Sequence, residues 1–183
     1  MLTAFFGFMR ISEFTSARAK SFNSQDTLCI PDIKQSDDLS YLIHIKASKT
    51  DPFRSGVHIR LAPNNTTLCP VQAMRSYLLV HKTNTGPVFT FTSGHYFTRQ
   101  SFSRVLQELK PDNPNISSHS FRIGAATTAA NMGFPRWLIK SLGRWNSDCF
   151  REYIRIPKET ISHVSRSIVL HTGDYTSFDP DLA

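Results

Sequence analysis

Residues 117–155 read SSHSFRIGAATTAANMGFPRWLIKSLGRWNSDCFREYIR, and this stretch decides how the rest of the chain is interpreted. His119 and Arg122 are separated by two residues, a spacing that places both side chains near one face of a helix. Two apolar, helix-like segments follow at 121–131 and 134–142. The stretch therefore predicts a pair of helices with a polar constellation at the start of the first.

The stretch ends on Tyr153, which lies between Arg151 and Arg155. A histidine, several arginines and a tyrosine suit the attack of a tyrosine hydroxyl on a phosphodiester, because arginine binds phosphate and histidine can move a proton. Each part is common by itself, since His-x-x-Arg pairs occur on solvated helices and a helical tyrosine usually packs. The hypothesis therefore depends on matching residues elsewhere in the chain.

Composition favours one folded domain with a polyanionic partner. The chain has 183 residues, of which 40% are apolar and 19% are charged, which is typical of a globular protein with a buried core. Its net charge is +7, and residues 117–166 contain eight basic and three acidic side chains. The positive charge is thus concentrated where the histidine and tyrosine lie.

Several classes of protein are disfavoured. The cysteines at 29, 69 and 149 are odd in number and widely spaced, so neither a disulfide framework nor a zinc site is predicted. No window has the ~18 uninterrupted apolar residues that a membrane span needs. The apolar opening at 1–9 runs directly into charged residues and is interpreted as a core helix rather than a signal peptide.

Hydrophobic periodicity predicts an α+β fold that is mainly helical, with a small three-stranded antiparallel sheet near the N-terminus. A single domain is expected over residues 1–170, followed by a flexible acidic tail over 171–183. The expected elements are helices at 2–14, 69–81, 98–110, 121–131, 134–142 and 160–170, and strands at 28–30, 41–47 and 57–62.

Two features of this layout have two interpretations each. Lys49 lies at the tip of the hairpin and is either a solvated loop lysine or a mobile cation that can reach a phosphate. Arg10 and Glu13 lie inside the apolar helix 2–14, where a charge needs a partner. The simpler interpretation is an i,i+3 ion pair on a partly wet face. Trp137 is expected in the core, and the aromatic residues of 87–98 are expected to pack rather than to stack on bases.

Read together, four motifs resemble the catalytic domain of tyrosine recombinases, the phage-integrase type of DNA strand-exchange enzyme. The resemblance covers roughly residues 1–168, and its wording is most similar to recombinases of eukaryotic mobile elements such as the Crypton and DIRS-type groups. Any one motif is weak, whereas four in the expected order are specific. The motifs are GFMRISEF around Arg10, IKASKTD around Lys49, HSFRIGAATTAA around His119 and Arg122, and LGRWNSDCFREYI ending on Tyr153.

The resemblance implies a role for each of these residues. Arg10 and Arg122 would clamp the scissile phosphate, because the planar guanidinium binds phosphate through two parallel hydrogen bonds. Tyr153 would form a 3′-phosphotyrosyl link, Lys49 would protonate the departing 5′-oxygen, and His119 would assist proton transfer. Glu13 would orient the site without touching DNA. No metal and no other cofactor is expected.

One position departs from the family pattern. The residue after the glycine of the LG motif is usually histidine or tryptophan, whereas here it is Arg144, with Trp145 next. Either side chain can contact a phosphate, and Trp145 is slightly favoured as the sixth catalytic residue, with Arg144 in a supporting role. The helical clamp domain that the family has ahead of the catalytic domain is not expected in this chain.

The expected partner is double-stranded DNA, with further contacts from Arg136, Lys140, Arg151 and Arg155. A homo-oligomer on DNA and a nuclear location are also expected, the latter only from the mobile-element resemblance, and no membrane contact is predicted. One alternative is a DNA-binding remnant that has lost catalysis. Another is a basic helical interaction domain, in which the residues of the four motifs would lie scattered in space.

Overall fold

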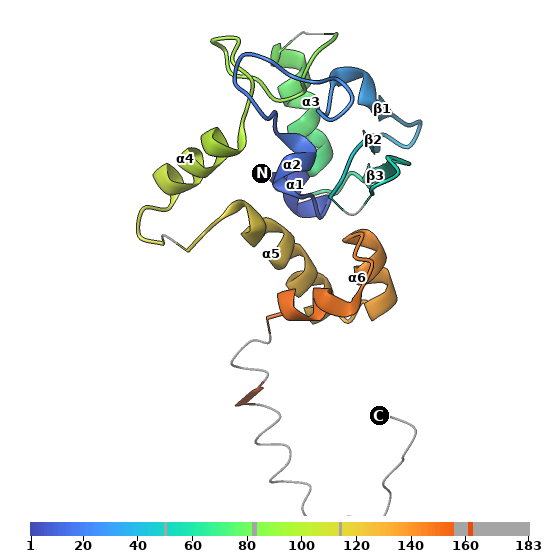
Figure 1. Cartoon of the computed structure of the whole chain (residues 1–183). Helices are drawn as coiled ribbons and strands as arrows, with labels where there is room; N and C mark the ends of the chain where they lie inside the picture. The colour runs from blue at the N-terminus through green and yellow to red at the C-terminus, as the bar shows by residue number, and fades with distance from the viewer. Residues whose placement is uncertain (50, 82–83, 114, 156–160, 163–183) are drawn as a thin grey trace, which may run out of the picture.

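The prediction of an α+β, mainly helical fold is confirmed by a computed structural model, which describes residues 1–49, 51–81, 84–113, 115–155 and 161–162. The sheet lies on one side of the molecule and α4 on the other, with α5 and α6 below them (Figure 1). The elements are α1 (Leu2–Phe6), α2 (Ile11–Phe14), η1 (Ile30–Asp32), β1 (Ile33–Gln35), β2 (Tyr41–Ile45), β3 (Val57–Leu61), α3 (Pro70–His81), α4 (Arg99–Leu109), α5 (Ser118–Asn131), α6 (Arg136–Leu142) and η2 (Asp148–Tyr153), where η denotes a 3₁₀ helix.

The sheet is antiparallel with the order β1-β2-β3, as the sequence predicts. In β2 the side chains of Tyr41, Ile43 and Ile45 are buried in alternation with half-buried neighbours, which is the period-2 pattern of a strand with one face in the core. The first strand was expected at 28–30 and this is wrong. It lies at β1 instead, because Cys29 pairs only in an isolated bridge and Pro31 starts the short helix η1.

The single helix expected over 2–14 is also wrong, because the chain breaks between α1 and α2. Phe8 adopts a positive φ of 48°, a conformation that a helix cannot contain. Met9 then runs to Arg10, which precedes α2 in an extended conformation and caps it through a backbone N–H bond to the Glu13 carboxylate. The break turns the backbone of residues 7–10 toward the C-terminal helices.

The helices expected at 69–81 and 98–110 are confirmed as α3 and α4. The Thr98 hydroxyl accepts a hydrogen bond from the backbone N–H of Ser101, a cap that stabilises a helix by about 1 kcal/mol. Phe89 and Phe97 pack against the larger hydrophobic core, as predicted, while Phe91 is 39% exposed.

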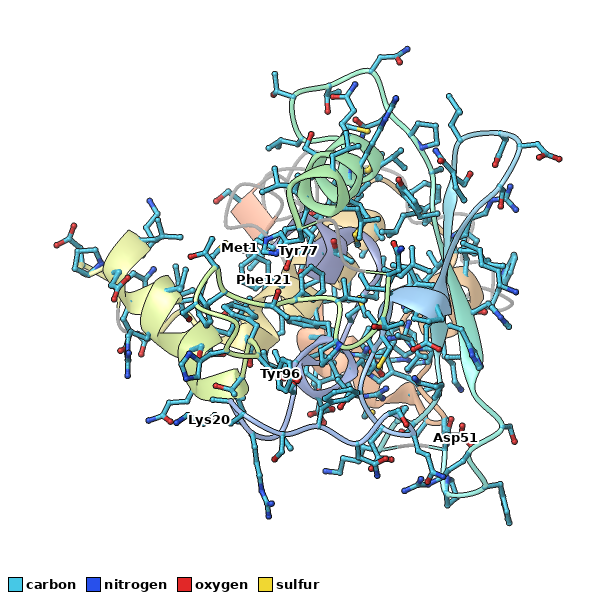
Figure 2. The ribbon with its side chains drawn as sticks, turned by 90° about the horizontal axis from the view of Figure 1, so that it is seen from above. Met1, Lys20, Asp51, Tyr77, Tyr96 and Phe121 are labelled. Carbon is cyan, nitrogen blue, oxygen red and sulfur yellow. The ribbon has the colours of Figure 1, made fainter. Side chains whose placement is uncertain are left out.

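An apolar cavity of about 300 Å³ lies beside this larger core. Met1 and Tyr77 both line it, and Figure 2 shows the two residues close together near the centre of the molecule. Figure 2 also shows Asp51 far from them, at the outer end of the connection between β2 and β3. The hairpin tip is therefore well separated from this cavity.

A second, smaller core joins α1 to the C-terminal helices. Ala125, Ala126 and Ala129 are buried on one face of α5, and their small side chains leave room for Phe8 and for the indole of Trp145. The small residues of the central stretch thus let α1 approach α5 closely. This contact brings residues 8–10 next to residues 143–145, although they are far apart in sequence.

Two predictions from the sequence cannot be followed in full. Most of the helix expected at 160–170, and all of the acidic tail over 171–183, lie outside the described residues. None of the helices within the described ranges is long and apolar enough to cross a lipid bilayer.

Candidate active site

One cavity of about 430 Å³ collects residues from all four sequence motifs. They come from the start of α2, the β2–β3 connection, the first turn of α5, the turn after α6, and η2. The interaction-domain alternative, which requires these residues to be scattered, is therefore wrong. The motif residues that line the cavity are Arg10, Lys49, His119, Arg122, Trp145 and Tyr153.

The lining of this cavity is cationic. Arg10, Lys49 and Arg122 contribute guanidinium and ammonium groups, and His119 adds an imidazole. No aspartate or glutamate is found among the described residues that line it. A concave surface with positive groups and no carboxylate attracts an anion, and the planar forks of two arginines match a phosphate group.

Arg10 is held by the carboxylate of Glu13. Its Nη1 donates to Glu13 Oε1 at 3.1 Å, and the Glu13 side chain is fully buried. The i,i+3 ion pair expected from the sequence is therefore present, but its acidic residue, Glu13, lies in the protein interior rather than on a solvent-exposed face. Burial strengthens the pair, since the lower dielectric reduces screening.

The hairpin that carries Lys49 is anchored to the same arginine. Arg10 Nη1 also donates to the Ser48 hydroxyl at 3.2 Å, and Lys49 follows directly in the turn. Lys49 is exposed and lines the cavity. The contact through Ser48 thus holds the segment that brings Lys49 to the cavity.

Arg122 is almost completely buried, with 1% of its surface exposed. Its two terminal nitrogens donate to the backbone carbonyls of Phe8 and Gly143. Its guanidinium carbon lies 4.1 Å from the centre of a Trp145 ring, a cation–π contact. Both carbonyls belong to segments that are distant from Arg122 in the sequence. The arginine therefore connects α1 and the turn after α6 to α5.

The charge of Arg122 is poorly compensated. Burial, and then the positive charges of Arg10 and Arg144, lower the pKa of Arg122 to about 9. The guanidinium stays charged at neutral pH but in an environment that disfavours the charge. An anion in the cavity would relieve this cost.

Trp145 forms the wall between Arg122 and Tyr153. Its indole is 7% exposed, and its ring centroid lies 5.7 Å from that of Tyr153. A Cβ atom at Gly143 would come within 1.5 Å of the Trp145 ring, so only glycine permits this indole position. The glycine of the LG motif is therefore explained by contact with the tryptophan.

Tyr153 lies at the end of the 3₁₀ helix η2. The Thr127 hydroxyl donates to the Tyr153 carbonyl at 3.0 Å, which fastens this segment to α5. The His119 ring packs edge-on against the tyrosine ring with centroids 4.9 Å apart. The two side chains that the hypothesis assigns to proton transfer and attack are therefore in contact.

The pKa of His119 lies below its usual range. Partial burial is the main cause, followed by the positive charges of Arg122 and Arg10. At neutral pH the imidazole is therefore neutral, with one nitrogen able to accept a proton and the other able to donate. A neutral histidine beside a tyrosine can assist removal of the hydroxyl proton.

Solved structures with the same fold are recombinases and an integrase. The XerA recombinase superposes with a TM-score of 0.63 at 16% identity, over 91% of this chain and 54% of that protein. The XerH site-specific recombinase bound to its difH substrate gives 0.59 at 14% identity, over 90% and 44%. The Tn1549 transposon integrase in complex with a circular intermediate DNA gives 0.57 at 12% identity, over 91% and 56%.

The fold is that of a tyrosine recombinase catalytic domain. The chain spans about half the length of the proteins it matches. A scan against protein-family models and a search of curated proteins gave no match. The likeness is thus carried by the arrangement of the backbone, at sequence identities too low to show more than the fold.

Within this recombinase fold, Arg144 and Trp145 face different sides. Trp145 lines the cationic cavity, whereas Arg144 lines a separate hollow beside Gly7 and Phe8. Arg144 has a positive φ of 53°, and this local turn sends the two side chains apart. Of the two side chains, only Trp145 lines this cavity, and it is the one that the sequence slightly favoured for the sixth catalytic position.

The four additional residues expected at DNA lie outside the cavity. Arg136, Arg151 and Arg155 are exposed, while Lys140 is half-buried. Lys140 and Arg151 both pair with Asp148, at 2.9 and 3.2 Å. These ion pairs share one exposed carboxylate and are weak, so they leave the cations available to another anion.

Sequence reasoning missed some of the cavity and misplaced one aromatic residue. Asn146 and Ser147 also line the cavity, and their position directly after Trp145 in the last motif was the signal that could have found them. Trp137 was expected in the core, and this is wrong because its side chain is 70% exposed on α6. Its spacing from Ile139, which is buried, places the two on different faces of the helix.

Proposed function

We propose that this chain cleaves and rejoins DNA strands in site-specific recombination or DNA integration. The observation that carries the proposal is the single cationic cavity in which Arg10, Arg122 and Tyr153 meet, although they come from separate parts of the chain. The two guanidiniums can donate paired hydrogen bonds to a phosphodiester, and the tyrosine supplies a nucleophile beside them.

In the proposed reaction the Tyr153 hydroxyl attacks the scissile phosphorus. A 3′-phosphotyrosyl bond forms, the bond to the 5′-oxygen breaks, and Lys49 gives a proton to that oxygen. The hydroxyl proton of Tyr153 passes to His119 or to water. Arg10, Arg122 and the indole N–H of Trp145 stabilise the charge that develops on the non-bridging oxygens. Rejoining reverses these steps with a different 5′-hydroxyl.

Two of the structures with this fold contain DNA, the XerH recombinase with its difH substrate and the Tn1549 integrase with a circular intermediate DNA, which supports a DNA substrate for this chain. Exchange of strands between two sites requires more than one copy of the chain on DNA, so a homo-oligomer is part of the proposal. An origin in a eukaryotic mobile element, with action in the nucleus, rests on the resemblance of the motifs alone.

The test is a suicide-substrate assay with nicked duplex DNA, in which the cleaved strand loses a short piece and cannot be rejoined. Wild type is expected to form a covalent protein–DNA band on denaturing gels, and Tyr153→Phe is expected to form none. Tyr77→Phe is the matched control, since this tyrosine lies on α3 and lines a different cavity. The same band in Tyr153→Phe would remove Tyr153 as the nucleophile.

A wild-type chain that binds DNA but forms no adduct would favour the alternative, a DNA-binding remnant. Binding by itself does not separate the two, because both predict an affinity that falls steeply with salt. The covalent adduct is therefore the deciding readout.

A further inference from the structure

Arg144 directly precedes the cavity residue Trp145, but its own side chain does not line the cavity. It lines the hollow on the far side of residues 7–8 and makes no contribution to the phosphate-facing surface. Its side chain is only 13% exposed, so its charge is held largely inside the protein. A buried arginine that faces away from the proposed substrate needs a different explanation.

The contacts of Arg144 join three segments. Nη1 donates to the carbonyls of Gly7 and Leu142, both at 3.1 Å. Nη2 donates to the Phe8 carbonyl at 3.1 Å and to Glu13 Oε2 at 2.6 Å. The guanidinium therefore fixes the break between α1 and α2 against the turn after α6, and it does so with both ends of its planar fork.

Glu13 links Arg144 to Arg10. Its Oε2 receives Arg144, and its Oε1 receives Nη1 of Arg10 at 3.1 Å. The backbone carbonyl of Arg144 also accepts from Arg10 Nη2 at 3.4 Å. Arg144 thus holds Arg10 in two ways. It acts indirectly through the carboxylate of Glu13, and directly through its own backbone carbonyl.

The orientation of Arg10 depends on this arrangement. A single buried carboxylate shared between two guanidiniums cannot turn fully toward either. Arg144 and the backbone N–H of Arg10 occupy Oε2, which leaves Oε1 for the Arg10 guanidinium. Without the Arg144 side chain, the carboxylate would lose one partner, and the turn that presents the Arg144 carbonyl to Arg10 Nη2 would lose its bonds to the carbonyls of residues 7–8. The Arg10 guanidinium could then rotate onto Glu13 and away from the cavity.

We propose that Arg144 is a positioning residue, which sets the guanidinium of Arg10 at the phosphate through Glu13 and through its own carbonyl, without touching DNA. The inference rests on the proposed function and adds a determinant of the same site. It assigns adjacent residues to opposite sides of the cavity wall, with Trp145 facing the phosphate and Arg144 locking the arginine that faces it.

The experiment measures single-turnover cleavage of nicked duplex DNA by wild type, Arg10→Ala, Arg144→Ala and the double variant. Arg144→Ala is expected to slow adduct formation about 10- to 100-fold, because a misplaced catalytic group has effects of this size. DNA affinity is expected to change less than about twofold, since Arg144 does not face DNA. The double variant is expected to be no slower than Arg10→Ala, because both changes disable the same group.

A second substrate separates positioning from a general loss of structure. A methylphosphonate at the scissile position removes the negative charge that Arg10 would neutralise. The defects of Arg10→Ala and Arg144→Ala are both expected to shrink to within about threefold, because transition-state charge stabilisation no longer requires the arginine. An equal slowing on both substrates, or additive defects in the double variant, would overturn the inference.

Two further variants keep the test decisive. Arg144→Lys retains a cation for Glu13 but has no fork, so its defect should fall between wild type and Arg144→Ala. Arg75→Ala, on the exposed side of α3, is the matched control and should behave as wild type. Thermal unfolding of every variant shows that the folded state is being compared.

The outcome for Arg144 can be distinguished from the outcome for the proposed function. An adduct in wild type with additive variants would sink only the role of Arg144. Absence of an adduct in wild type would overturn the proposed function, and the same four-protein cycle would then be measured by calorimetry with inorganic phosphate. Weaker phosphate binding in Arg144→Ala, not additive with Arg10→Ala, supports the positioning role, and unchanged binding contradicts it.

Discussion

Arg10 and Arg122 line the same cavity but lie in opposite electrostatic surroundings. Arg10 is paired with the buried carboxylate of Glu13, which also receives Arg144. Arg122 has backbone carbonyls and the Trp145 ring as its neighbours, and its pKa is lowered to about 9. One arginine is fixed by a neutralising charge, and the other is fixed by backbone dipoles in the wall of the cavity, which leave its charge without a paired carboxylate. Arg10 is therefore the cation that is held in a fixed position, and Arg122 is the cation whose charge is left to attract an anion.

The largest effect is expected from Glu13→Gln, which removes the carboxylate that pairs with Arg10 and Arg144. The change leaves two largely buried guanidiniums without their carboxylate, so the free energy of unfolding should fall by about 3–5 kcal/mol. Urea denaturation measures it, with Glu108→Gln on the exposed face of α4 as the control. A loss below about 1 kcal/mol would show that the network contributes little to stability.

The Arg122 side is tested by Arg122→Lys, which keeps the charge but removes the fork. Adduct formation should fall about 10²- to 10³-fold, because the lost contacts matter most where charge develops in the transition state. DNA affinity, measured by fluorescence anisotropy, should fall much less. Equal losses in cleavage and affinity would instead assign Arg122 to binding.

The uncompensated charge of Arg122 also predicts that small oxyanions stabilise the folded protein. Inorganic phosphate at one hundred times its dissociation constant should raise the free energy of unfolding by about 2.7 kcal/mol, at constant ionic strength. Denaturation with and without phosphate measures this, and Arg122→Met should abolish the gain. Persistence of the gain in Arg122→Met would place the anion elsewhere.

The smallest effect concerns His119, which lies between the two arginines and Tyr153. Its pKa is lowered in the folded state, so as pH falls below about 6.5 the unfolded chain takes up a proton first. Stability is therefore present above that pH and is lost as pH falls toward the folded-state pKa. Unfolding measured between pH 5 and 8 should show a shallower slope in His119→Gln. An unchanged slope would mean that His119 titrates normally.

The sequence predicted the helical framework and the members of the site because their signals are local. Apolar periodicity defined α3 and α4, and the spacing of His119 from Arg122 placed both near one helical face. The convergence of these residues with Arg10 and Tyr153 was expected only from the order of the motifs. The structure brings them to one cavity, and their catalytic roles stay predictions.

What the sequence did not predict depends on contacts between distant segments. The break between α1 and α2 lies in an apolar run with helical periodicity, and it forms because Arg122 and Arg144 bind the carbonyls of residues 7–8. The outward position of Trp137 has a related cause, since α6 packs through Ile139 instead. Tertiary hydrogen bonds and packing overrode local preference in both places.

The shared Phe8 carbonyl, which accepts from both Arg122 and Arg144, also constrains when the site can form. These bonds span 114 and 136 residues of sequence, and the Arg10–Arg144 contact spans 134. Long-range closure of this kind is slow and comes late in folding, because chain entropy must be lost before the contacts form. During synthesis, Arg10 therefore emerges long before the C-terminal residues that complete the cavity. The cavity that collects the four motifs is complete only when the C-terminal helices have emerged from the ribosome and closed the structure.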